Sequence, residues 1–341
     1  MHGLLSIGRD LVASARLHEW WPSKIPLLLA CILYAALTRA APDPALLARM
    51  LWLLLALCGY AAFGYSVNSF SDRFVDGAGK ANPFTGMPES TAYAVMLAGL
   101  VVAFAPALIF SAVYAGTSVS VLFLASFGLA AAYSLAPVRL KERGFLGVLA
   151  AALAQRTLPA AIVFEAMGAW DSASVMLCLL STPIGIRYML VHQISDEAAD
   201  RAAGVSTFAT ERGTPRLKRY IGRLVFPGEL ALLAVTLWLM SYTAPGLVPA
   251  VALYLVWCAL QIATRKDSGW SFASDTYRVL APFYYLFLPV TLAVLLTARE
   301  PGFWPALLLT CIWTCRRFLS EFRILTKIIR GPGTRRRRTQ T

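Results

Sequence analysis

Long apolar blocks separated by short polar connections make up most of the chain. A helix needs about 20 apolar residues to span the hydrocarbon core of a bilayer, and the blocks have about this length. We predict spanning helices at 25–40, 45–68, 90–113, 118–136, 146–166, 172–194, 220–243, 246–264, 277–298 and 303–319. The pattern therefore predicts an all-α polytopic membrane protein with about nine to ten transmembrane helices.

The last apolar block decides between the two helix counts, because Arg316 and Arg317 interrupt it. A tenth crossing, or a re-entrant hairpin, would return the arginine-rich end of the chain to the side of the N-terminus, and we favour ten. The predicted organisation is then a cytoplasmic or interfacial segment at 1–24, a transmembrane bundle at 25–298, an extra hydrophobic and basic helix at 299–330, and a disordered arginine-rich tail at 331–341.

Composition agrees with a membrane protein, since 58% of the residues are hydrophobic and only 14% are charged. The net charge of +13 is concentrated, because residues 301–341 hold nine Lys and Arg against the single Glu321. A cluster such as Arg335–Arg338 beside a membrane helix is typical of the cytoplasmic face and of contact with anionic lipid headgroups. We therefore expect a basic tail near anionic lipids, and no nucleic-acid partner.

The basic residues of the connections lie almost entirely on one side of the predicted membrane. If the N-terminus is cytoplasmic, the opposite side keeps only Arg39, Arg49 and Arg299. This asymmetry fits the positive-inside rule. We therefore expect a multi-pass protein of the cell (inner) membrane with a cytoplasmic N-terminus. The blocks at 45–68 and 172–194 then both run inward, so polar residues at their ends reach the same face.

Two polar runs follow these inward-running blocks, Asn68-x3-Asp72-x3-Asp76 and Asp196-x3-Asp200. A four-residue step advances a helix by about 400°, so each run projects from one face. Carboxylates are costly near hydrocarbon and mark functional sites by default. Successive Asp side chains are about 6 Å apart along the axis, a spacing that suits a Mg²⁺-bound diphosphate. A solvated helix end with a glycine-rich loop is the alternative for the first run.

Polar and basic side chains accompany the two runs. His192 extends the second run by one turn and could be a metal ligand, a base or a hydrogen-bond partner of Asp196. Arg139, Lys141 and Lys80 fall on the same predicted face and suit the developing charge of a departing diphosphate. Loops on the positive side of a membrane also carry such residues without any catalytic role.

Three further cations lie in or beside apolar blocks. Arg156, which follows Gln155, and Arg187 lie well inside their blocks, where an unpaired guanidinium is expensive. Each should meet either substrate charge or a buried acid. Lys24 precedes the first block beside Trp20 and Trp21, so it could contact an acidic co-substrate or belong to an interfacial anchor.

At these residues the chain resembles the UbiA superfamily of intramembrane prenyltransferases. The first run is similar to the family's N-x3-D-x3-D motif and the second to its D-x3-D motif. The intervening Tyr133-x3-Pro137-x-Arg139-Leu-Lys141 and the Gly204-x2-Thr207 step are also similar to the family's. Together these motifs cover residues 65–210, and the helix count extends the likeness over most of the chain.

The resemblance implies a helical bundle around a central cavity that opens to the cytoplasmic side. It implies a prenyltransferase, a transferase of alkyl groups other than methyl, with Mg²⁺ as cofactor. An allylic prenyl diphosphate would be ionised and its chain transferred to a lipophilic or aromatic acceptor. Carried over by position, the metal ligands would be Asn68, Asp72, Asp76, Asp196 and Asp200, and the catalytic set would be these four Asp residues with Tyr133. Substrate would be bound by Asn68, Lys80, Arg139 and Lys141, and we add Arg156, Arg187, His192 and Lys24.

The chain departs from familiar members at Ser69, where many have Asp, in Lys80-Ala-Asn-Pro, and in the extra C-terminal segment. These differences leave the acceptor open, and neither the prenyl chain length nor the oligomeric state follows from the sequence. The same residues also allow three other functions. These are phosphoribosyl transfer to a polyprenyl phosphate, a terpene cyclase with the same ionising residues, and, in a different class, a membrane transporter.

Overall fold

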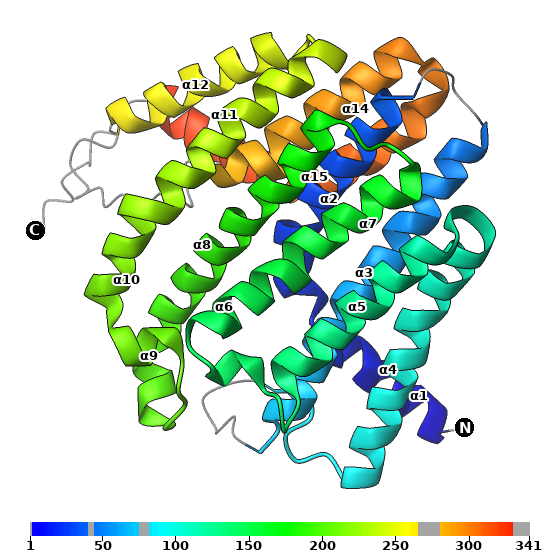
Figure 1. The fold of residues 1–341 in the computed structure, drawn as a ribbon, viewed down its shortest axis with the longest axis vertical. Coiled ribbons are helices and arrows are strands. Elements are labelled where there is room, and N and C mark those ends of the chain that lie inside the picture. Colours follow the sequence, from blue (N-terminus) through cyan, green and yellow to red (C-terminus); the bar gives the residue numbers. More distant parts are fainter. Residues whose placement is uncertain (1, 40–43, 75–81, 265–279, 330–341) are drawn as a thin grey trace, which may run out of the picture.

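Helices and short loops make up the whole of the described structure, a computed structural model that describes residues 2–39, 44–74, 82–264 and 280–329. No strand occurs in these ranges. Figure 1 shows the helices packed side by side into one bundle. They are α1 (His2–Ser14), α2 (Leu17–Leu37), α3 (Pro44–Asp72), α4 (Glu89–Phe110), α5 (Thr117–Ser134), α6 (Phe145–Ala152), α7 (Leu158–Met167), α8 (Ser172–Ala202), α9 (Phe208–Arg212), α10 (Thr214–Tyr220), α11 (Phe226–Thr243), α12 (Leu247–Thr264), α14 (Leu288–Arg299) and α15 (Trp304–Ile329).

Within the described residues, eight helices are long and apolar enough to cross a membrane. They are Leu17–Leu37, Ala45–Asp72, Glu89–Ala115, Thr117–Ser134, Phe145–Met167, Ser172–Ala202, Thr214–Thr243 and Leu280–Arg299. The prediction of an all-α polytopic membrane protein is confirmed. The apolar stretch Leu247–Gln261 of α12 is shorter, and α15 carries arginines in its second half. The number of crossings and the cytoplasmic N-terminus stay predictions.

Four of the long helices contain a π-helical segment: η1 (Ser111–Ala115), η3 (Leu153–Thr157), η4 (Ile221–Val225) and η5 (Phe283–Phe287). η3 joins α6 to α7 and η4 joins α10 to α11, so each pair forms one continuous span. A π-helical turn adds a residue without breaking the helix and often occurs where a side chain must be redirected. Arg156 and Tyr285, which contact each other across the bundle, both lie in such segments.

The N-terminal region is more helical than the predicted interfacial segment at 1–24. α1 packs against α4, and α2 begins at Leu17, eight residues before the predicted span. Arg16 joins the two helices in a left-handed conformation (φ 47°), and the indole of Trp20 donates to the Ala15 carbonyl across this turn. α2 continues through Pro22 and Pro26 into the centre of the bundle, where it contacts α3, α7, α14 and α15.

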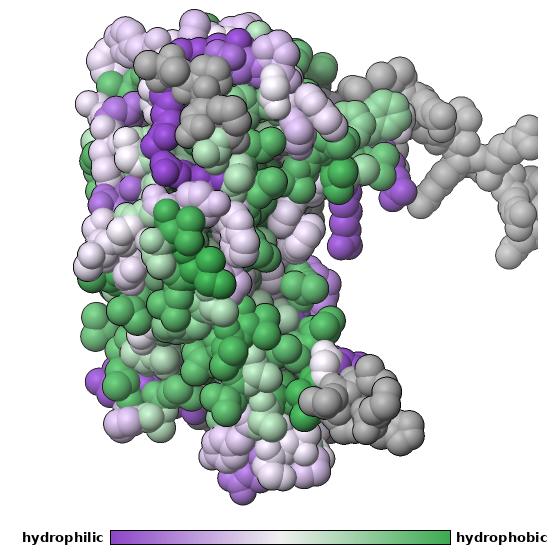
Figure 2. All heavy atoms as spheres, turned by 90° about the vertical axis from the view of Figure 1, so that its right-hand side faces the viewer, coloured by the Kyte–Doolittle hydropathy of each residue, from purple (hydrophilic) through white to green (hydrophobic). Residues whose placement is uncertain are grey.

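Apolar side chains cover much of the outer surface as well as the core. Large exposed apolar residues line α4, α11 and α12, among them Leu97, Val101, Trp238 and Leu253. On the face shown in Figure 2, hydrophobic side chains fill the middle of the molecule and hydrophilic ones gather mainly near its upper end. An apolar exterior of this extent is what a bundle surrounded by lipid requires.

A fully buried ion pair joins α8 to α11. Arg187 donates from Nε to Glu229 Oε2 (2.5 Å) and from Nη2 to Oε1 (2.8 Å), and both side chains are completely enclosed. The Tyr284 hydroxyl donates a further bond to Glu229 (3.1 Å). Of the two possibilities left open for Arg187, the structure shows the buried acid: Glu229 neutralises its charge, and Arg187 lines neither the cleft nor the chamber of the candidate active site.

Because the two charges neutralise each other, we predict that replacing one of them destabilises the protein more than replacing both. Glu229→Ala strands the enclosed guanidinium and should lower the free energy of unfolding by about 3–5 kcal/mol. Replacing both partners with apolar residues, Arg187→Met with Glu229→Leu, should cost much less, because no charge is then left buried. Denaturation of the detergent-solubilised protein measures both. Arg201→Ala, which removes an exposed partner of Glu197 on the same α8, is the control and should leave the unfolding midpoint nearly unchanged. Equal losses in the single and double variants would contradict this interpretation.

Candidate active site

The C-terminal end of α3 carries the first polar run. Asn68 and Asp72 lie one turn apart on the same face, and α3 ends at Asp72. The Asn68 side-chain oxygen accepts hydrogen bonds from Lys141 Nζ (3.2 Å) and from the Ser134 hydroxyl (3.4 Å). The chain after α5 therefore closes over the end of α3 and brings its cations to the acidic run.

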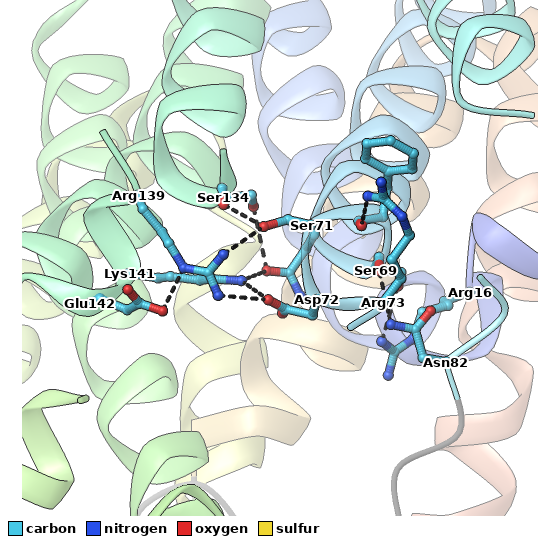
Figure 3. A network of polar contacts seen from close by, with 12 residues as sticks. Arg16, Ser69, Ser71, Asp72, Arg73, Asn82, Ser134, Arg139, Lys141 and Glu142 are labelled. Carbon is cyan, nitrogen blue, oxygen red and sulfur yellow. Dashed lines mark hydrogen bonds and ion pairs between the residues drawn. The ribbon is translucent and has the colours of Figure 1, made fainter. Parts of the chain in front are cut away.

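Two cations neutralise Asp72, as Figure 3 shows. The Lys141 ammonium pairs with Asp72 Oδ1, and Arg139 Nη2 lies 3.3 Å from the same oxygen. Arg139 adopts a left-handed conformation (φ 39°) just before the short 3₁₀ turn η2 (Leu140–Glu142). This turn aims both cations back at α3, and Glu142 holds the Arg139 guanidinium from its other side. Burial lowers the pKa of Lys141 from its ordinary value of 10.5, and the Asp72 carboxylate opposes this shift.

The end of α8 forms the opposite wall of a cleft. Asn68, Asp72, Tyr133, Arg139 and Lys141 line this cleft from one side, and His192, Asp196, Asp200 and Thr207 line it from the other. The empty space in the cleft, including the part that is open to solvent, is about 690 Å³. Two polar runs that are far apart in the chain thus share one cavity.

Within the α8 wall, His192 and Asp196 are neighbours on successive turns. His192 Nε2 lies 3.7 Å from Asp196 Oδ2, and the Ser195 hydroxyl bonds the other oxygen (3.2 Å). The His192 side chain is 65% exposed. It therefore faces the open cleft and can contact a ligand there.

The cleft continues into a chamber between α2, α3, α5 and α6–α7, and the empty space in it, including the part open to solvent, is about 900 Å³. Asn68, Tyr133, Met189 and His192 line both spaces, so they mark the junction. Beyond it the wall is mostly apolar and made of small residues: Ala61, Gly64, Ala130, Ala151 and Ala154. Small side chains leave room for a ligand inside a bundle that is otherwise closely packed.

Lys24 and Arg156 differ in their access to this chamber. Lys24 lines it, and its ammonium lies 4.4 Å from the centre of the Tyr65 ring. Arg156 is 4% exposed and donates to the Ser23 carbonyl (2.9 Å) and the Tyr285 hydroxyl (3.3 Å). It lines neither the chamber nor the cleft. The structure thus shows buried polar partners for Arg156, which join α2, η3 and η5, and its contact with substrate stays a prediction.

Ser69, which differs from the familiar pattern, faces away from the cleft. Its side chain is buried and accepts a hydrogen bond from Arg16 Nη1 (3.3 Å), and its carbonyl accepts one from Asn82 (2.8 Å). The exchange of Asp for Ser at this position therefore leaves the cleft unchanged. Asp76 and Lys80 lie outside the described residues, as does the tail Arg335–Arg338.

Sequence reasoning missed several residues that line the two cavities, among them Tyr60 and Gly64 in the chamber and Met189 and Gln193 in the cleft. A signal for two of them was present. The four-residue spacing of Asn68 and Asp72 extends backward through Gly64 and Tyr60, so one face of α3 carries a stripe from the cleft into the chamber. The residues contributed by α6–α7 have no comparable pattern.

The donor atoms of the cleft suit a hard cation that arrives with a phosphate ligand. Among the described residues, no three His, Cys, Asp or Glu side chains form a group that could hold a metal ion unaided. The oxygen-bearing side chains of Asn68, Asp72, Asp196 and Asp200 nevertheless line one cavity. Mg²⁺ is commonly held by one or two carboxylates together with substrate phosphate oxygens. This set therefore fits Mg²⁺ bound jointly with a diphosphate.

Comparisons with known proteins agree with this arrangement. The family model described as the UbiA prenyltransferase family matches residues 26–276. The fold is similar to that of a UbiA homolog from Archaeoglobus fulgidus bound to GPP and Mg²⁺, with 17% identity over 83% of this chain and 99% of that one (TM-score 0.54). The same homolog bound to DMAPP and Mg²⁺ is 18% identical over 80% of this chain and 96% of that one (TM-score 0.53). No curated protein matches the sequence.

Proposed function

The chain belongs to the UbiA prenyltransferase family, and we propose that it ionises an allylic prenyl diphosphate with Mg²⁺ and transfers the prenyl chain to a lipophilic or aromatic acceptor. One observation carries the proposal: a cleft lined by two acidic runs and two cations opens directly into an apolar chamber. A prenyl diphosphate has the same division, a multiply charged head joined to an apolar chain.

The diphosphate end is assigned to the cleft. Bound Mg²⁺, held by Asn68, Asp72, Asp196 and Asp200 and by Asp76 beyond the described residues, would neutralise diphosphate charge and make it a better leaving group. Lys141 and Arg139 pair with Asp72. On substrate binding these cations can transfer to diphosphate oxygens, where they stabilise the charge that develops as the C–O bond breaks. His192 supplies a further contact from α8, and Lys80 one from the chain after α3.

The chamber is assigned to the prenyl chain and the reacting carbon. Breaking the C1–O bond sends the electron pair to the diphosphate and leaves an allylic cation. Tyr133 lies at the junction of cleft and chamber, where its ring can stabilise that cation. The acceptor then forms the new bond and loses a proton. Lys24 lines the same chamber and is assigned to an acidic group of the acceptor.

One assay separates this function from the two alternative enzyme activities, a terpene cyclase and a phosphoribosyl transferase. Purified protein with Mg²⁺ is incubated with labelled prenyl diphosphates of several lengths, with and without a membrane extract. We expect prenylated product only when the extract supplies an acceptor. Product formed without extract would instead identify a cyclase. Turnover confined to phosphoribosyl diphosphate with polyprenyl phosphate would contradict the proposal, and the apolar lining of the chamber already argues against a ribose there.

Two neighbouring acids on α8 provide a matched test of the metal site. Asp196 lines the cleft, whereas Glu197 bonds Thr214 and Arg201 away from it. Asp196→Asn should lower kcat/KM for diphosphate release by about 100-fold or more, because a charged ligand is lost where charge develops. Glu197→Gln should stay close to wild type. Equal effects in the two variants would contradict the assignment of Asp196.

Lys141 should bind the diphosphate group, including diphosphate released as product. Lys141→Gln should lower kcat/KM by about 10- to 100-fold and weaken inhibition by inorganic diphosphate, because a charge-assisted contact worth about 1.5–3 kcal/mol is removed. The exposed Lys218 on α10 is the control, and Lys218→Gln should change neither quantity. If inorganic diphosphate inhibits Lys141→Gln as strongly as wild type, Lys141 pairs with Asp72 but does not bind diphosphate.

Gly64 should set the room available to the prenyl chain. It lines the chamber, and a Cβ at this position would meet no atom within 4 Å. Gly64→Leu should fill chamber volume and shift the ratio of kcat/KM values toward shorter donors by about tenfold. Gly128 on α5 is equally unobstructed but exposed on the outside of the bundle, so Gly128→Leu should leave the ratio unchanged. A uniform loss across donors in Gly64→Leu would argue against a prenyl chain in the chamber.

A further inference from the structure

A second groove lies between the first half of α2 and the middle of α15, outside the candidate active site. Its empty volume, counted out to open solvent, is about 1410 Å³. Pro22 and Pro26 line it, whereas Lys24 lines the chamber. Positions two apart on a helix point to nearly opposite sides, so α2 separates the two spaces. α15 also lies beyond residues 26–276, which the family model matches.

Aromatic and apolar side chains form the wall of this groove. Trp21 stacks on Trp313 with ring centres 3.7 Å apart and planes 11° apart, and the Trp313 indole donates to the Trp21 carbonyl (3.2 Å). Tyr285 adds a third ring from η5. Ile312 lies at the rim and is 63% exposed. The stack fixes α15 against α2 and leaves an apolar surface that faces outward.

Basic side chains line one end of the groove without any acid among its lining residues. Arg316 and Arg317 are consecutive on α15, and His18 of α2 lines the same groove. Arg317 Nη2 pairs with Glu321 (3.1 Å), but its Nε is buried without a hydrogen-bond partner. Arg316 is exposed and makes no ion pair within the described part of the chain. A buried guanidinium N–H without an acceptor is rare in proteins, and an anion held by these two arginines would supply one.

We propose that this groove binds an anionic phospholipid, with its phosphate on Arg316 and Arg317 and its acyl chains along Trp21 and Ile312. Guanidinium groups match phosphate oxygens in charge and geometry. Basic pockets between membrane helices bind anionic headgroups in this way, and Trp rings favour the membrane–water interface. The apolar wall next to the basic end requires a ligand with both an anion and hydrocarbon, which a free phosphate lacks.

Quenching of Trp21 and Trp313 by brominated lipids tests this proposal on the intact chain. The protein is reconstituted in phosphatidylcholine vesicles that contain brominated phosphatidylglycerol or, at the same mole fraction, brominated phosphatidylcholine. We expect stronger quenching by the anionic lipid. This preference should disappear when Trp21 and Trp313 are both replaced by Phe, which identifies the groove as the source of the signal.

Arg316 is the informative position, because it is exposed and makes no described ion pair, so its substitution spares the fold. Arg316→Gln should reduce the preference for anionic lipid about fivefold. Arg323→Gln removes an exposed arginine of the same helix that does not line the groove, and it should leave the preference intact.

Three results would overturn the proposal. These are equal quenching by the two lipids in the wild type, equal losses in Arg316→Gln and Arg323→Gln, and abolition of the preference by inorganic phosphate alone. The second result would mean general attraction to a basic surface, and the third a site for free phosphate. Prenyl transfer is not measured, so failure here would leave the proposed function unaffected.

Discussion

Asp72 places a carboxylate at the end of a long apolar helix, and its neutralisation organises the site around it. A charge in this position is expensive unless it is paired. Lys141 and Arg139 supply the pairing, and they reach Asp72 because the chain turns sharply through the left-handed Arg139 into η2. Two hydrogen bonds tie the end of α5 to α3 beside this turn: the Ser134 hydroxyl donates to the Asn68 side-chain oxygen, and the Ser71 hydroxyl donates to the Ser134 carbonyl. The ion pairs that neutralise Asp72 therefore place beside the acid the cations that a diphosphate would need.

The buried charges of this chain fall into two classes that composition alone does not distinguish. Arg187 and Glu229 neutralise each other inside the bundle, and Tyr284 donates a further bond to Glu229, although Arg187 Nη1 has no hydrogen-bond partner among the described residues. Asp72 and Asp196 instead line an open cleft, where a ligand can reach them. A charged residue is therefore a candidate catalytic residue when its side chain lines a cavity, and a structural one when it does not. Its position within an apolar block of the sequence does not make this distinction. The same criterion moves Arg156 to the structural class and keeps Lys24 among the candidates.

Helix periodicity and loop charge were enough to predict the helical membrane fold and the meeting of the two polar runs. Both depend on spacing along one helix and on chain direction, which the sequence contains. The partners of Arg187 and Arg156 could not be predicted, because they depend on how helices rotate against each other. Glu229 is 42 residues from Arg187, and Tyr285 is 129 residues from Arg156. The early start of α2 was missed for a related reason: Pro22 and Pro26 resemble helix breakers, yet the helix continues through both.

α2 is the element that connects the two spaces, because it forms a wall of each. Its Lys24 lines the chamber, and its Pro22, Ser23 and Pro26 line the groove against α15. Arg156 bonds the carbonyl of Ser23 and the hydroxyl of Tyr285, a groove residue. A ligand that altered the packing of α15 on α2 would therefore act on the helix that positions Lys24. If the two ligands favour different placements of α2, thermodynamic linkage requires each to change the affinity of the other by the same factor. α15 would then change the affinity for the acceptor without contributing a residue to the chamber.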